Sequence, residues 1–151
     1  LSIEAQSKVA HINTQQLISE MPEVITAQNE LKKLEEQYAK ELETSAKEFQ
    51  TKAPTYQGDA QNQTELINQQ RIVELQEMQQ RIQEFRETAA QELQKRSAEM
   101  MRPLYEKARV AIEKVATAQG FDYVLDSSPG GSVIMASGTD LITAVKTDLG
   151  F

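Results

Sequence analysis

The sequence predicts a mostly α fold with a small β body (α+β), in which a long antiparallel helical hairpin projects from a strand-built body. Helix-forming residues dominate the stretch from about 23 to 119, which contains a single glycine. Apolar side chains in that stretch recur every three or four positions, as on one face of a helix. Strand patterns occur only near the two ends of the chain, so the ends must meet and the helices between them must fold back.

The body is predicted to begin with a strand at about 8–13, in which Ala10 and Ile12 share one face. Asn13, or the threonine after it, is suited to cap a short helix that ends near residue 21. Pro22 interrupts this helix and is well placed in the first turn of the next one. Residues 1–21 are therefore assigned to the body.

Residues 22–103 are predicted to form the hairpin arm. Within its first half the steps between apolar residues are three and four, which makes a continuous helical seam. The turn signal at 56–62 includes Gly58 and places the tip of the arm there. Pro54 should fray or kink the end of the first helix, and Pro103 should bend the second helix.

The remainder of the body is predicted at 104–151. Gly120 is expected to end the long return helix as its C-cap. Strands are predicted at about 121–126 and 132–136, and a terminal helix at about 141–149. A body this small cannot bury a large core alone, and its strands leave edges that need covering. We therefore expect the body to form a homo-oligomer.

Composition excludes several classes of function. The chain of 151 residues is 39% hydrophobic and 5% aromatic, which is lean for a compact globule. Its net charge of −7 disfavours partners rich in phosphate, so no nucleic acid is expected as a partner. No run of about 18 apolar residues is present, so no stable membrane insertion is expected. The absence of cysteine excludes disulfides and thiolate chemistry.

No catalytic, cofactor-binding or metal site is predicted, and the protein is expected not to be an enzyme. The single histidine, His11, has no second nitrogen ligand beside it and is read as an interface or partly buried imidazole. Asp122 and Asp126 share a face at the ends of a strand, but turn formation explains them better than acid–base chemistry. The glycine-rich run at 129–132 lacks the lysine of a phosphate-binding loop, so any function should be ATP-independent.

The arm carries adaptable methionine and aromatic side chains that suit loose apolar contact with varied partners. Packing within the hairpin explains most of these residues equally well, because they lie on the seam. Met101 lies off the seam and is expected to be more exposed than the others. The candidate partner-contacting residues are Phe49, Tyr56, Met78, Phe85, Met100 and Met101.

The order of elements resembles the Skp (OmpH-like) periplasmic chaperones of Gram-negative bacteria, and the glutamine-rich arms look most like Bacteroidetes members. The resemblance covers nearly the whole chain, although the helical middle matches in character rather than by motif. The matching segments are KVAHIN at 8–13, MPE at 21–23, PLYEK at 103–107, VA at 115–116, GFDYVLD at 120–126 and DLIT at 140–143.

The resemblance implies a homotrimer with a strand-built trimerisation body and three coiled-coil arms around a cavity. The partners would be unfolded outer-membrane proteins, sequestered by a periplasmic holdase that prevents their aggregation. A start at Leu1 rather than methionine fits removal of a signal peptide, or a trimmed gene. One feature differs from the best-known members, whose arms are basic. Residues 22–103 hold 15 acidic and 11 basic side chains, a net charge of −4, so apolar and amide contacts are expected in place of electrostatic capture or lipopolysaccharide binding.

Two other interpretations remain open. A prefoldin-like subunit also pairs a helical hairpin with strands, but it inserts them between the long helices, where 56–62 is too short to hold them. A structural coiled-coil envelope scaffold or adaptor would use the hairpin as a rod rather than as a cavity wall.

Overall fold

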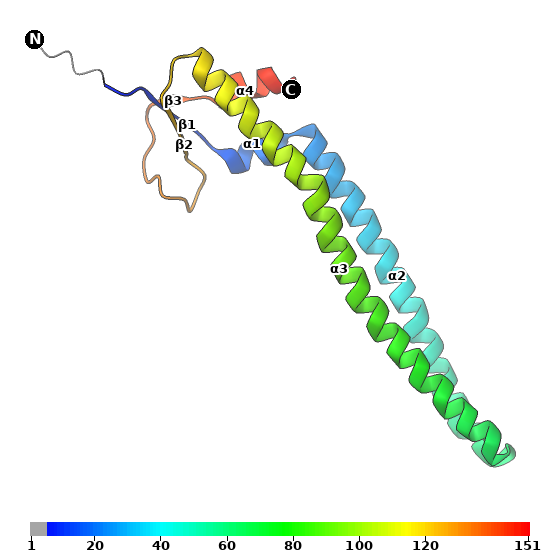
Figure 1. Ribbon diagram of the computed structural model, residues 1–151. Coiled ribbons are helices and arrows are strands. Elements are labelled where there is room, and N and C mark those ends of the chain that lie inside the picture. Colours follow the sequence, from blue (N-terminus) through cyan, green and yellow to red (C-terminus); the bar gives the residue numbers. More distant parts are fainter. Residues whose placement is uncertain (1–5) are drawn as a thin grey trace, which may run out of the picture. The chain divides into compact units, whose positions relative to one another are not determined.

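A computed structural model describes residues 6–151. Two compact units divide the chain: a body, up to Asn29 and from Ala98, and an arm, Glu30–Ser97. The predicted mostly α fold with a small β body and a helical arm is confirmed (Figure 1). The elements are β1 (Val9–Ile12), α1 (Thr14–Glu20), α2 (Pro22–Asp59), a 3₁₀ turn (Ala60–Asn62), α3 (Glu65–Ala118), β2 (Tyr123–Asp126), β3 (Thr139–Asp140) and α4 (Ile142–Leu149).

The body contains a parallel three-stranded sheet in the order β2-β1-β3. Ala10 of β1 lies opposite Val124 of β2 and Thr139 of β3, so strands from the two ends of the chain pair directly. Ala10 and Ile12, which the predicted alternation places on one face of the strand, are 2% and 1% exposed, so that face is the inner one. The two ends of the chain meet through this sheet, as the strand pattern predicts.

The inner face of the sheet packs on a core formed by α1, the start of α2, the end of α3, and α4. Alanines of α3 such as Ala108 and Ala111 are nearly inaccessible, and their small side chains let neighbouring elements approach closely. Lys107 forms an ion pair with Glu23 at 2.8 Å, and Lys146 forms one with Glu20. The core residues are Ala10, Ile12, Leu17, Met21, Val24, Ala27, Met101, Ala108, Ala111, Val115, Ala116, Leu141 and Val145.

The predicted helix boundaries in the body follow from local chemistry. The Asn13 side chain accepts a hydrogen bond from the Gln16 backbone N–H at 2.9 Å, which caps α1. Met21 is extended and Pro22 opens α2, as expected for a proline in a first turn. Gly120 has φ of +75°, and the Phe121 N–H bonds back to Ala116, so the predicted C-cap of α3 is confirmed.

The strand predicted at 132–136 is wrong. Residues 127–138 are irregular, and the third strand is the short β3. Because β2 and β3 both run parallel to β1, the chain must return along the sheet between them, and residues 127–138 make that return. The 132–136 segment pairs with no strand in the part of the chain that the structure describes.

The predicted tip is displaced. α2 continues through Gly58 to Asp59, so the turn lies at 60–64 rather than at 56–62. Pro54 is inside α2, and the fraying expected there does not occur. One glycine in a helix interior costs about 1 kcal/mol of stability. The contacts at the tip, described below, stabilise the end of α2 in helical form. α3 likewise continues through Pro103, and bending at either proline stays a prediction.

The division between the two units falls inside α2 and α3, at 29/30 and 97/98. The sequence placed it at the two prolines, Pro22 and Pro103. In the part of the chain that the structure describes, no helix is both long and apolar enough to cross a membrane.

Candidate functional site

The arm packs its two helices through the apolar seam that the spacing predicts. Tyr38 of α2 and Phe85 of α3 meet edge to face, with ring centroids 5.8 Å apart and ring planes at 89°. Met78 is 6% exposed, and Phe49 and Phe85 are half-buried. These predicted contact residues of the arm therefore pack mainly between α2 and α3, and only part of each aromatic ring is exposed to a partner.

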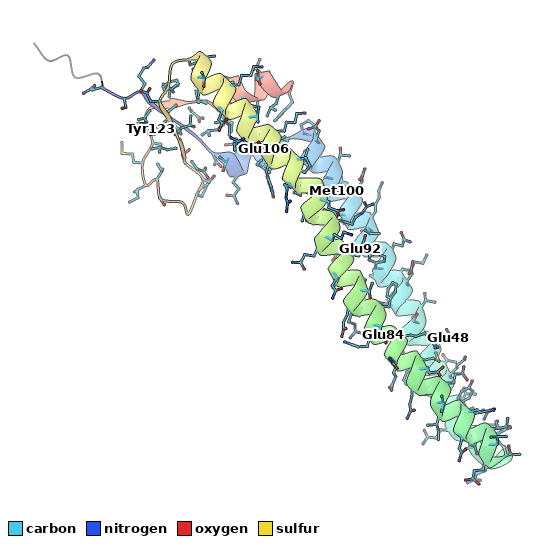
Figure 2. The ribbon with its side chains drawn as sticks, viewed as in Figure 1. Glu48, Glu84, Glu92, Met100, Glu106 and Tyr123 are labelled. Carbon is cyan, nitrogen blue, oxygen red and sulfur yellow. The ribbon has the colours of Figure 1, made fainter. Side chains whose placement is uncertain are left out.

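A groove of about 470 Å³ lies along the seam between α2 and α3. It brings together two predicted residues, Met78 and Phe85, with Leu42 and Ile82 as apolar neighbours. Charged side chains complete its lining, and Figure 2 shows that Glu48 comes from α2 and Glu84 from α3. The charged members are Glu41, Glu48, Lys52, Arg81 and Glu84. A groove of this kind can take an apolar side chain.

Tyr56, a further predicted contact residue, belongs to a polar network at the tip. Its hydroxyl donates a hydrogen bond to Glu74 at 2.7 Å, and the Lys52 ammonium donates to the same carboxylate at 2.6 Å. Arg71 lies over the Tyr56 ring at 4.6 Å and pairs with Asp59 at 3.0 Å. The hydrogen bond from Lys52, and then that from Tyr56, lowers the pKa of Glu74. This network joins α2 to α3.

Hydrogen bonds to the same carboxylates explain the other pKa shifts at the tip. Donation to Glu74 raises the pKa of Tyr56, since it favours the protonated phenol. Arg71 lowers the pKa of Asp59, assisted by the amides of Gln63 and Asn62. Lys52 with Glu74 and Arg71 with Asp59 thus form ion pairs at the tip, and the Tyr56 hydroxyl is used in a hydrogen bond that joins α2 to α3.

Met100 and Met101 lie in the body. Met101 is 8% exposed and belongs to the core, so the expectation that it is the more exposed of the candidates is wrong. Met100 is half-buried against the same core. A position off the arm seam is here an inward-facing position of the body, because α3 packs on different neighbours in the two units. The six predicted residues therefore form no single site.

Exposed apolar side chains outside the predicted set include two groups within residues 6–151. The first is the outer face of the sheet, where Val9 lies opposite Tyr123 and His11 lies opposite Leu125. Val9, Tyr123 and Leu125 are 44%, 60% and 45% exposed. Ile134, in the loop after β2, is fully exposed. The alternation of Val9 with inward-facing Ala10 is a signal that could have identified this face from sequence.

The second surface lies on α3 near the tip of the arm. Leu66, Ile72 and Val73 are each more than half exposed. The apolar pattern resumes at Leu66 but becomes regular only at residue 75, so the spacing does not identify Ile72 or Val73.

His11 holds the loop that follows β2. Its Nδ1 lies 2.9 Å from the Ser127 hydroxyl and its Nε2 lies 3.3 Å from the Gly138 carbonyl oxygen. The imidazole is half-buried on the outer face of the sheet. Residues 6–151 contain no group of three or more His, Cys, Asp or Glu side chains placed to hold a metal ion.

Asp122 and Asp126 organise the ends of β2, as the turn-forming interpretation predicts. The Lys8 backbone N–H donates to Asp122 at 2.8 Å, and the Thr14 hydroxyl donates to Asp126 at 2.8 Å. Partial burial raises the pKa of Asp126, but hydrogen bonds from Ser128 and Thr14 outweigh it and the pKa is lowered. These carboxylates tie the ends of β2 to Lys8, which precedes β1, and to Thr14, the first residue of α1.

Comparison with known proteins gives one family and one fold. The model of the family described as "Outer membrane protein (OmpH-like)" matches residues 8–149. A crystal structure from Caulobacter crescentus CB15, described as that of a proposed outer membrane chaperone (OmpH-like), aligns with a TM-score of 0.84 at 18% identity. The alignment covers 96% of this chain and 85% of that chain, and at this identity it establishes the fold alone. No curated protein matches the sequence significantly.

Proposed function

This chain belongs to the OmpH-like outer membrane protein family, and from that premise we propose that it is an ATP-independent periplasmic holdase chaperone. Its clients would be unfolded outer-membrane proteins, which it would hold in a cavity between helical arms of a homotrimer until they insert. The family match over residues 8–149 carries the proposal, because it spans both the arm and the body.

The outer face of the sheet supports assembly through the body. Val9, Tyr123 and Leu125 form a contiguous apolar face, and water-exposed faces of this kind mark interaction surfaces. Ile134 and Met135, which are 102% and 79% exposed, add two large side chains in the neighbouring loop. Covering these side chains with further copies of the chain would complete the core of a body that is too small alone.

The arm supports a holding role that needs no chemistry. Its groove offers Met78, Phe85 and neighbouring aliphatic side chains in a partly open, adaptable setting. Many weak contacts of this kind keep exposed β-segments of an unfolded client from pairing with one another. Energy input is unnecessary, since release can follow from transfer of the client to its folded state.

The test measures aggregation and mass together. An outer-membrane β-barrel protein is unfolded in urea and diluted into buffer with and without the full-length chain, and light scattering is recorded without nucleotide. We expect suppression near one assembly per client, no change on adding ATP, and a solution mass of three chains. An unrelated acidic helical protein at equal concentration is the control. A trimer without suppression would favour the envelope scaffold, and a monomer without suppression would end the chaperone proposal.

A further inference from the structure

Near the tip, α3 exposes a second stripe that faces away from the seam. Leu66, Gln69, Val73 and Gln76 are separated by steps of three and four, so they share one face of the helix, and Ile72 lies beside them. Leu66, Ile72 and Val73 are 65%, 56% and 51% exposed, and both glutamines are exposed as well. We call these five residues the tip stripe.

The tip stripe itself carries no charge, and the charges nearby are largely neutralised by pairing. Arg71 pairs with Asp59 at 3.0 Å, and Arg81 pairs with Glu77 at 3.7 Å. Lys52 of α2 pairs with Glu74 of α3 at 2.6 Å. Glu65, at the first position of α3, is the exposed acidic neighbour at the end of the stripe. A charged ligand would therefore gain little from ion pairing at the tip stripe, whereas an uncharged apolar ligand needs no ion pair to bind.

We infer that the tip stripe is a binding site for uncharged, apolar segments of unfolded polypeptide in extended conformation. The aliphatic side chains provide the apolar area. Each glutamine amide is both a donor and an acceptor, so Gln69 and Gln76 can bond the N–H and C=O groups that an unpaired strand leaves open. The inference rests on the proposed function and names the kind of client segment that the arm recognises.

The apolar area of the tip stripe is too small for stable binding of a second copy of this chain. Three half-exposed aliphatic side chains offer a few hundred Å² at most, whereas a stable protein–protein interface buries about 800 Å² on each partner. A contact of this size is weak by itself. It suits a client that touches several arms and several segments at once, where weak contacts add through effective concentration.

The test replaces two stripe residues, Ile72→Gln and Val73→Gln, in the full-length chain. Glutamine forms helices better than either β-branched residue, and both side chains are exposed, so the arm should keep its helix content and melting temperature. The matched control is Ile25→Gln with Val110→Gln, two aliphatic residues of the body that are 46% and 50% exposed. The probe is a urea-unfolded outer-membrane β-barrel protein carrying a fluorophore.

We expect the stripe variant to bind this probe about tenfold more weakly, the result of losing burial of two half-exposed side chains, with the control within about twofold of the wild type. The weakening should be the same at low and high salt. An unchanged affinity in the stripe variant, an equal loss in the control, or binding that falls steeply with salt would each overturn the inference. If the wild-type chain itself fails to bind the unfolded probe, the proposed function fails first, and the inference fails with it.

Discussion

Replacing Tyr123 by threonine tests whether the outer face of the sheet is covered in the assembly. An aromatic side chain buries roughly 150–250 Å² when fully covered, so a Tyr123 that is 60% exposed leaves about 100 Å² for a partner to bury. At about 25 cal/mol per Å² this area contributes about 2.5 kcal/mol per copy, of which threonine would retain a small part. The loss of about 2 kcal/mol per contact corresponds to about 30-fold in Kd for adding a copy.

Threonine keeps the strand propensity of β2, and the replaced side chain is not part of the core, so the monomer fold should survive. Sedimentation equilibrium over a range of protein concentrations would follow the shift from assembly to monomer. Tyr105→Gln is the matched control, because Tyr105 is 52% exposed but lies on α3 rather than on the sheet. Equal assembly of the Tyr123 variant and the wild type, or equal dissociation of the control, would refute the assignment of this face.

Three further predictions concern stability. Leu17→Ala should destabilise the chain by about 2–5 kcal/mol in urea unfolding, because Leu17 is fully buried in the body core. Gly58→Ala should stabilise the arm by up to about 1 kcal/mol, since Gly58 is helical and a Cβ there would meet open space. Gly120→Ala should destabilise the body by about 1–2 kcal/mol, because the φ of Gly120 is +75°. Because the pKa of Glu74 is lowered in the folded state, its pairing stabilises the arm above the unfolded pKa and is lost as pH falls through the folded one. Thermal unfolding followed by circular dichroism from neutral to acid pH should therefore lose less stability in Glu74→Gln than in the wild type.

Local signals in the body were sufficient to predict most of its elements. Asn13 as a cap, Pro22 as a first-turn residue and Gly120 as a C-cap each act within a few residues of chain, so their effect can be read without knowing the tertiary structure. The prediction of a strand at 132–136 was wrong because strand formation depends on residues far away in the sequence. Its residues favour a strand, but whether a strand forms depends on tertiary pairing, and the sheet pairs β1 with Thr139–Asp140 rather than with 132–136.

The candidate contact residues show the same limit. Periodicity identifies side chains that pack inside a hairpin, and Met78 and Phe85 are found there. A surface that binds a partner consists of side chains that stay exposed after this packing. It can therefore be identified only from the complete fold and not from the spacing of the seam. Met101 illustrates this: it lies off the seam, yet α3 has entered the body at this position and the side chain is buried.

The acidic net charge of the arm indicates less about its surface than the pairing of its charges does. Near the tip, the basic groups of Lys52, Arg71 and Arg81 each lie within 4 Å of a carboxylate, so their fields are largely cancelled at short range. What remains open on α3 is aliphatic and amide surface, as at Leu66 and Gln69. Ion pairs of this exposed kind weaken in salt, but the contacts proposed for the client do not depend on them. Retention of an unfolded chain by this arm should therefore persist at ionic strengths that release ligands from a basic arm.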